Sequence, residues 1–371
     1  MFSLNIAVSK KSPVIILLLS VLFSKAQQNA HTLELNLQKS ISSFSANQND
    51  LQGNAYGGEL IFHYNVNREP RKWSSDLGIK SIDVIFNYKR MADVNRIANP
   101  QKGEFGDSYG LLGGLTFPLF NISKVDIAFT PGFGLLYAGE SWFSNQNPLV
   151  GSKLNFGLKA GLKLNVPVNK KTELSANLDV LHYSNGGTRV PNNGLNVVSV
   201  GISIARALNE NVEVAKPNFE KETYKKHSFD LGVNAGRRGV YQSRDGLWRT
   251  GLYGGYNYRL TSYLALGTGI DAVYYHTTYD PNRGLETYQS KASSFERWRV
   301  GATIGPDLWM GNLAFMAKYG YYIHYNSLLP VKTYWTTGAK YKLNNWLALQ
   351  SKIYIHQTEA DYVGFGVMFT K

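Results

Sequence analysis

The sequence contains no cysteine, and beyond its first residues it has no long uninterrupted apolar run. Without cysteine, neither a disulfide framework nor a thiolate metal site can form. Without roughly 18 consecutive apolar residues, a transmembrane helix is excluded. Such a chain can still cross a membrane if its strands close into a barrel, because a closed sheet satisfies every backbone hydrogen bond.

The amino-terminal residues predict export. Lys10 and Lys11 precede an apolar run over 14–23, and Ser24-Lys25-Ala26 places small residues where a signal peptidase cleaves. We therefore expect a signal peptide over residues 1–26 and a mature chain that begins near Gln27.

The charge balance is basic, with a formal net charge of +13, of which three positive charges belong to the leader. An exported protein rarely meets nucleic acid, so we expect no nucleic-acid partner. Anionic headgroups of the outer membrane, such as the phosphates of lipopolysaccharide, are the expected partners. The alternative is that these charges are solvated residues of loops and of a barrel lumen.

Alternation of apolar and polar residues with period two dominates the mature chain. Over 153–166, for example, Leu154, Leu158 and Leu162 share one face, while Lys159 and Lys163 share the other. This period is that of a β-strand with one apolar face. Sixteen such strands are expected, near 31–41, 56–66, 76–91, 107–117, 124–139, 151–166, 171–184, 195–206, 227–237, 247–259, 262–276, 295–307, 311–325, 332–343, 345–358 and 361–370.

The connections alternate in length. Those at 118–123 and 167–170 are short, while those at 42–55, 92–106 and 140–150 are longer. Short periplasmic turns alternating with longer outer loops are typical of outer-membrane barrels, as are aromatic residues at the ends of the apolar strips. The sequence therefore predicts an all-β fold, an antiparallel transmembrane β-barrel of the cell outer membrane.

A polar segment over 208–226, which contains Pro217, divides the strands into two sets of eight. We favour two tandem eight-stranded barrels, over 27–207 and 227–371, because the segment is longer than a periplasmic turn. One sixteen-stranded barrel is the alternative.

The chemically informative stretch is 181–196, LHYSNGGTRVPNNGLN. His182 and Ser184 continue the apolar face of their strand, so they point toward lipid at its outer end. Residues two apart on a strand stand side by side, which lets an imidazole reach a serine hydroxyl. If the hairpin closes with Ser184 opposite Asn196, then Asn196 lies diagonal to His182 and completes a triad. The alternative is ordinary turn chemistry with a non-catalytic polar network.

The string HYSNGG-x₃-PN-x-G, within 182–196, resembles the signature of the lipid A 3-O-deacylase (PagL) family and of bacterial acyloxyacyl hydrolases. The wider resemblance covers about residues 30–207. It implies an eight-stranded barrel with a His-Ser-Glu triad on its outer surface, which hydrolyses the ester at the 3-position of lipid A.

Carried over by position, the resemblance makes His182 the base and Ser184 the nucleophile. Asn192 and the backbone N–H groups around Gly186 and Gly187 match the oxyanion-stabilising region. Asn196 occupies the position of the acid. A neutral amide orients an imidazole but supplies no charge to stabilise the imidazolium, so the site is expected to be slow or inactive compared with one that carries a carboxylate.

The sequence thus predicts an outer-membrane serine esterase that removes an ester-linked acyl chain from lipid A and needs no metal or cofactor. Arg189 is a candidate contact for a lipid A phosphate or else a solvated loop residue. His356 lies on the polar face of its strand, so the second half is expected to lack a site. The alternatives are a catalytically inactive lipopolysaccharide-binding or structural barrel, and a pore.

Overall fold

The computed structural model describes residues 30–45, 51–98, 100, 103–210, 219, 224–279, 294–329, 331–357 and 359–371. The predicted signal peptide over 1–26 and most of the predicted linker lie outside these residues. None of the helices in the described ranges is long and apolar enough to cross a membrane.

The first half of the chain forms a closed antiparallel ring. β10 pairs with β11 on one side and with β9 on the other, and this closes the sheet. β7 and β8 act as one strand between β6 and β9, interrupted at Thr130 and Pro131. Its strands are β1 (Thr32–Phe44), β3 (Tyr56–Asn65), β4 (Ser81–Arg90), β6 (Ser108–Ile122), β7 (Val125–Phe129), β8 (Gly132–Ala138), β9 (Leu154–Asn169), β10 (Thr172–Ser184) and β11 (Leu195–Ala207).

The second half forms another closed barrel, in which β12 pairs with both β13 and β19. Its strands are β12 (His227–Gly239), β13 (Gly246–Arg259), β14 (Leu264–Tyr275), β15 (Trp298–Met310), β16 (Leu313–His324), β17 (Thr333–Lys342), β18 (Leu347–His356) and β19 (Glu359–Thr370). The shorter elements of the chain are β2 (Leu51–Gln52), β5 (Asn95–Arg96), η1 (Val66–Arg68), α2 (Lys72–Leu77) and α3 (Trp142–Asn145).

The predicted fold class is confirmed, and the sixteen strand positions form two barrels of eight rather than one of sixteen. Two predicted boundaries differ most from the structure, each by five residues. The strand expected over 76–91 begins at Ser81, because the chain first forms α2, which ends at Leu77 and is followed by the capping residue Gly78 with φ 66°. The strand expected to end at 117 continues to Ile122, since a register shift after Pro118 accommodates the proline.

The outer walls are apolar and the interiors are polar, as in transmembrane barrels. Along β9, exposed leucines alternate with buried Lys159 and Lys163. Inside the first barrel, Lys159 Nζ bonds to Glu59 and Asp179, while Lys163 pairs with Glu34. The lumen is therefore filled with mutually neutralising side chains.

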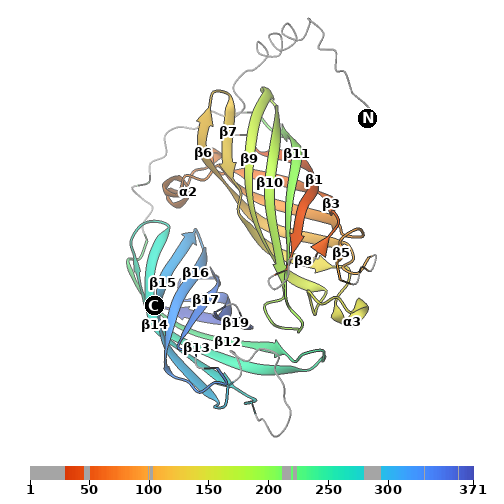
Figure 1. Ribbon diagram of the computed structural model, residues 1–371. Helices are drawn as coiled ribbons and strands as arrows, with labels where there is room; N and C mark the ends of the chain where they lie inside the picture. The colour runs from red at the N-terminus through yellow and green to blue at the C-terminus, as the bar shows by residue number, and fades with distance from the viewer. Residues whose placement is uncertain are drawn as a thin grey trace, which may run out of the picture.

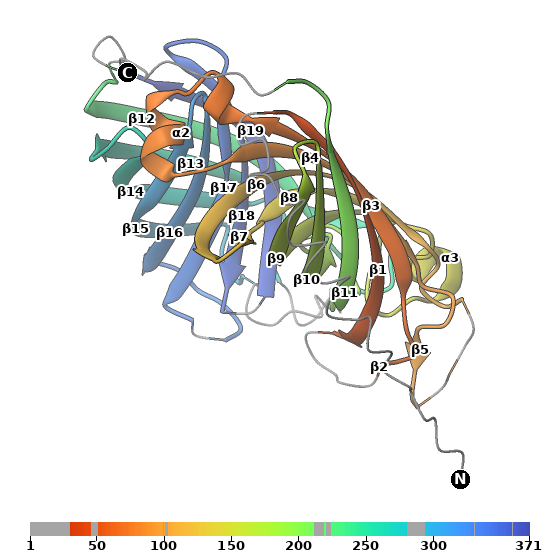
Figure 2. The same cartoon turned by 90° about the horizontal axis from the view of Figure 1, so that it is seen from above.

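The two barrels lie side by side and touch at both ends (Figure 1 and Figure 2). We call the end that carries the connections 45–55, 91–107, 139–153 and 185–194 the loop end. At the opposite end, Ser262 Oγ donates to Asp76 Oδ2 at 2.5 Å. At the loop end, the Gly239 N–H donates to the Gly187 carbonyl at 2.8 Å. The connection 185–194 of the first barrel is thus in direct contact with the second barrel.

Candidate active site

The β10–β11 hairpin fixes the relative positions of the candidate residues. Asn196 lies directly opposite His182, and the last pair is Tyr183 with Leu195. Ser184 instead faces Phe156 of β9. The expected register, with Ser184 opposite Asn196, is therefore wrong by two residues, because the chain leaves β10 after Ser184 and rejoins the sheet only at Leu195.

The outer face of β10 carries Leu174, Leu178 and Val180, which are exposed, and then His182 and Ser184, which are half-buried. The intervening residues of the strand point into the lumen. His182 and Ser184 therefore stand two residues apart on the lipid-facing wall, at the loop end of the strand.

Asn196 orients the imidazole of His182. The His182 Nδ1 and Asn196 Oδ1 atoms are 2.9 Å apart, and Asn196 Nδ2 donates to the Phe44 carbonyl at 3.1 Å. Because the amide nitrogen is committed to a carbonyl, the oxygen faces His182 and accepts the proton on Nδ1. In the neutral imidazole, this contact leaves Nε2 as the nitrogen that can accept a hydrogen bond.

Gly194 makes room for the imidazole. Its φ is 68°, and a Cβ at this position would lie 2.9 Å from His182 Cε1. Glycine is therefore needed both for the left-handed backbone and for close packing against the ring. The hairpin loop closes over the histidine and limits its orientation.

Ser184 does not bond to His182 among the described residues. Catalytic hydrogen bonds are often long or unformed in ligand-free structures and tighten when substrate binds. The geometry therefore supplies an imidazole oriented by Asn196 and a neighbouring hydroxyl on the same face.

Asn185 organises the loop that follows Ser184. Its Oδ1 accepts from the N–H groups of Gly187 at 3.0 Å and of Arg189 at 3.3 Å. Its own N–H donates to Asn192 Oδ1 at 2.9 Å.

The Gly187 N–H is thus occupied, while the Gly186 N–H and Asn192 Nδ2 have no hydrogen-bond partner within the described ranges. These two donors are therefore not used within the loop. Sequence reasoning did not single out Asn185, although asparagine ahead of a Gly-Gly turn is a signal for such an Asx turn.

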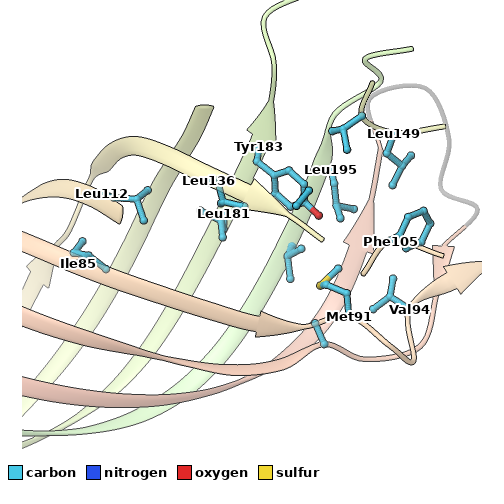
Figure 3. Close-up of a cluster of buried hydrophobic side chains, with 14 of the residues drawn as sticks. Ile85, Met91, Val94, Phe105, Leu112, Leu136, Leu149, Leu181, Tyr183 and Leu195 are labelled. Atoms are coloured by element: carbon cyan, nitrogen blue, oxygen red, sulfur yellow. The ribbon is translucent and has the colours of Figure 1, made fainter. Parts of the chain in front are cut away.

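A cluster of buried apolar side chains supports the hairpin from inside the barrel (Figure 3). Leu181, Tyr183 and Leu195, the inward neighbours of the candidate residues, pack in it with Leu136 and Phe105. Tyr183 is 1% exposed. This cluster fills the loop end of the lumen and holds the backbone that carries His182 and Ser184.

The second barrel borders the site, which the sequence did not predict. A Cβ on Gly186 would lie 2.4 Å from Val363 Cγ2, so the loop backbone packs against β19. The rings of Phe156, opposite Ser184, and Phe365 of β19 have centroids 6.5 Å apart. The candidate site therefore lies where the two barrels meet.

The remaining predicted residues lie in two different places. The Arg189 guanidinium donates to the Arg244 carbonyl of the second barrel. His356 is buried within the second barrel, where it bonds to Tyr322 and Arg299. His356 therefore lies inside the second lumen, apart from the pair on the outer wall of the first barrel.

The fold and the outward-facing His/Ser pair define a class, the antiparallel transmembrane β-barrels with a polar site on the outer wall. Comparison with known families is more specific. Residues 81–205 match the family model "Lipid A 3-O-deacylase (PagL)", and residues 227–371 match "Acyloxyacyl hydrolase, C-terminal domain". The first match falls within the first barrel and the second spans the second barrel, so each barrel is similar to a different family model.

Among solved structures, the outer-membrane enzyme PagL is 16% identical over 46% of this chain and 97% of its own, with a TM-score of 0.32. CdiB from Acinetobacter baumannii is 13% identical over 94% of this chain and 60% of its own, with a TM-score of 0.19. The Pseudomonas putida toluene transporter TodX is 10% identical over 92% of this chain and 89% of its own, with a TM-score of 0.18. No curated protein matches the chain.

Proposed function

We propose that the protein is an outer-membrane serine esterase that hydrolyses an ester-linked acyl chain of lipid A, at the 3-position. The observation that carries the proposal is the His182–Asn196 contact on the lipid-facing wall, beside Ser184. The match of residues 81–205 to the lipid A 3-O-deacylase family supplies the substrate class.

In the proposed reaction, His182 Nε2 takes the proton of the Ser184 hydroxyl as Ser184 Oγ attacks the ester carbonyl carbon. Collapse of the tetrahedral intermediate breaks the bond to the sugar oxygen, which receives the proton from His182. Water, activated by the same Nε2, then releases the fatty acid from Ser184. The net reaction is ester plus water to alcohol plus carboxylic acid, so no redox partner enters it.

The oxyanion of each intermediate is held in this proposal by Asn192 Nδ2 and the Gly186 N–H. Donors that are fixed before the reaction stabilise the developing charge without a cost of reorganisation. Asn192 is fixed because its Oδ1 already accepts from the Asn185 N–H.

In this proposal, the reaction takes place in the outer leaflet. Exposed leucines on β10 point toward lipid below the pair, and the loops lie above it. We propose that residues 1–26 direct export, that 27–207 form the barrel with the esterase site, that 208–226 link the domains, and that 227–371 form a barrel without its own site.

Asn196 favours one alternative, a catalytically inactive barrel that binds lipopolysaccharide. An amide leaves the imidazolium uncompensated, and loss of the triad acid elsewhere costs about 10⁴ in kcat. The pore is disfavoured because buried ion pairs and the apolar cluster fill the first lumen.

The deciding experiment is mass spectrometry of lipid A from cells that express the full chain or its Ser184→Ala variant. Loss of one hydroxy-fatty acid with the natural chain but not with the variant is the expected result. Ser42→Ala is the matched control, since Ser42 is exposed near the loop end of the same wall, opposite Val198 of β11, and should leave activity unchanged. If cells that express the natural chain, Ser184→Ala or Ser42→Ala all contain the same lipid A, the esterase proposal is wrong. The inactive lipopolysaccharide-binding barrel is then the remaining function.

A further inference from the structure

Three arginines from the two barrels converge beside the candidate loop. Arg189 belongs to the 185–194 connection, Arg237 to the end of β12, and Arg244 to the β12–β13 turn. The guanidiniums of Arg189 and Arg237 both donate to the Arg244 carbonyl. The guanidinium carbons of Arg189 and Arg244 lie 5.9 and 5.8 Å from the centre of the Phe143 ring. The Arg244 carbonyl and the Phe143 ring thus hold three cationic side chains close together.

Backbone contacts between the barrels fix the positions of these arginines. The Gly239 N–H donates to the Gly187 carbonyl at 2.8 Å, and the Gln242 N–H donates to the Val190 carbonyl at 3.2 Å. A Cβ on Gly239 would lie 2.7 Å from Arg189 Cα, so the two chains are in close contact. We call the contact between the 185–194 connection and the second barrel the seam. Its backbone hydrogen bonds hold the three arginines in fixed positions.

The cluster carries excess positive charge. Within the described ranges, none of the three arginines makes a salt bridge, and Asp245 is the acidic residue close enough to influence Arg189. Burial, together with the neighbouring Arg237 and Arg244, lowers the pKa of Arg189. Like charges held this close are stabilised by an anion that bonds to several guanidiniums at once, and phosphate is such an anion.

The seam is also at the depth of lipid headgroups. It lies at the same loop end as His182 and Ser184, and the rings of Trp142 and Tyr241 stack beside it with centroids 6.4 Å apart. Tyrosine and tryptophan gather at the level of headgroups because their rings are amphipathic. An anion bound here would belong to an amphiphile whose acyl chains run down the outer wall.

We propose that Arg189, Arg237 and Arg244 form a phosphate-binding site shared by the two barrels, which holds the phosphorylated headgroup of the lipid substrate. The ester-linked chain of that lipid then lies along the wall that carries Ser184. The site rests on the proposed function only for the identity of the lipid, and it gives the second barrel a role in substrate recognition.

The test measures binding without turnover. The full chain carrying Ser184→Ala is placed in detergent micelles, and its affinity for bisphosphorylated and for fully dephosphorylated lipid A is compared. Adding Arg237→Gln with Arg244→Gln should weaken binding of the phosphorylated lipid by at least about tenfold, since hydrogen bonds between charged groups are among the strongest. Binding of the dephosphorylated lipid should be unchanged, which also shows that the fold is intact.

Arg297→Gln is the matched control, because Arg297 is an exposed arginine of the same barrel that bonds to Tyr274 instead. It should leave both affinities unchanged. Equal affinity of the double variant and its parent for the phosphorylated lipid would overturn the site. The site would also be overturned if inorganic phosphate bound the parent as tightly as the lipid does, because the site would then recognise free phosphate and not a lipid headgroup. Neither result depends on hydrolysis, so a failure of the esterase proposal would be seen separately.

Discussion

His182 Nδ1 lies 2.9 Å from Asn196 Oδ1, at the place where family resemblance expects a carboxylate. The contact gives the imidazole the tautomer and orientation of a general base, because Asn196 Nδ2 is held by the Phe44 carbonyl. It supplies no negative charge that would stabilise an imidazolium in the proposed reaction. Orientation and charge, which a triad acid supplies together, are thus separated in this protein.

Restoring the charge should raise activity. Asn196→Glu is expected to increase lipid A deacylation by at least about tenfold, because a carboxylate stabilises the imidazolium. Asn196→Ala should lower it by a further factor of about 10 to 100, since the ring loses its orientation. Release of fatty acid from purified lipid A measures both changes. Asn121→Glu adds the same charge at an exposed position at the opposite end of the barrel and should change nothing. Equal rates for all four proteins would show that residue 196 plays no part in catalysis.

Gly194 offers a test that leaves the candidate residues in place. Gly194→Ala should reduce deacylation by at least about tenfold, because its Cβ would lie 2.9 Å from His182 Cε1 and displace the ring. Gly78→Ala is the control: its φ of 66° imposes similar backbone strain, but its Cβ would meet nothing within 4 Å. Activity is compared with the thermal unfolding of both variants. If the two lose activity equally, strain and not the position of His182 is responsible.

The alternating pattern predicted the strands and the face of His182 and Ser184, because side-chain direction in a strand depends only on local sequence. It could not predict the register at Asn196. That register is set by where the chain rejoins the sheet after a loop, and the loop is held by Asn185 and Asn192.

The contact between Gly186 and Val363 was also beyond the sequence, since it joins residues on different barrels. Such a contact depends on how two complete domains pack, for which period-two alternation carries no information. The apolar outer faces of β9 and β19 gave no sign of which residues meet lipid and which meet each other.

The ion pairs in the first lumen predict a large cost for removing one partner. Lys159 Nζ lies 2.5 Å from Glu59 Oε2 and 3.2 Å from Asp179 Oδ1, and all three side chains are buried. Lys159→Met should lower the free energy of unfolding by about 3–5 kcal/mol, because it removes the cation in direct contact with two buried carboxylates. Urea unfolding in lipid vesicles measures the change. Lys171→Met, at an exposed turn, should have little effect. A stability equal to that of the natural chain would mean that water or other groups neutralise the lumen.

The seam between the barrels can be tested by a double-mutant cycle at Gly186 and Val363. Gly186→Ala should destabilise the protein and reduce activity, because the new Cβ would lie 2.4 Å from Val363 Cγ2 and the φ of 64° disfavours alanine. Val363→Ala removes the clashing methyl group. The double variant should therefore recover the stability lost to the clash, but not the stability lost because alanine disfavours the positive φ at residue 186. The coupling between the two sites is expected to be about 1 kcal/mol in thermal unfolding, with a parallel recovery of deacylation.

Val367→Ala is the control for that cycle, since Val367 follows Val363 on the same face of β19 but lies nearer the opposite end of the barrel. It should give no recovery when combined with Gly186→Ala. Additive effects for both pairs would mean that the barrels do not pack at this seam in the membrane. Recovery with Val363 alone would mean that β19 sets the conformation of the loop behind Ser184, so that the second barrel acts on the site through backbone contact.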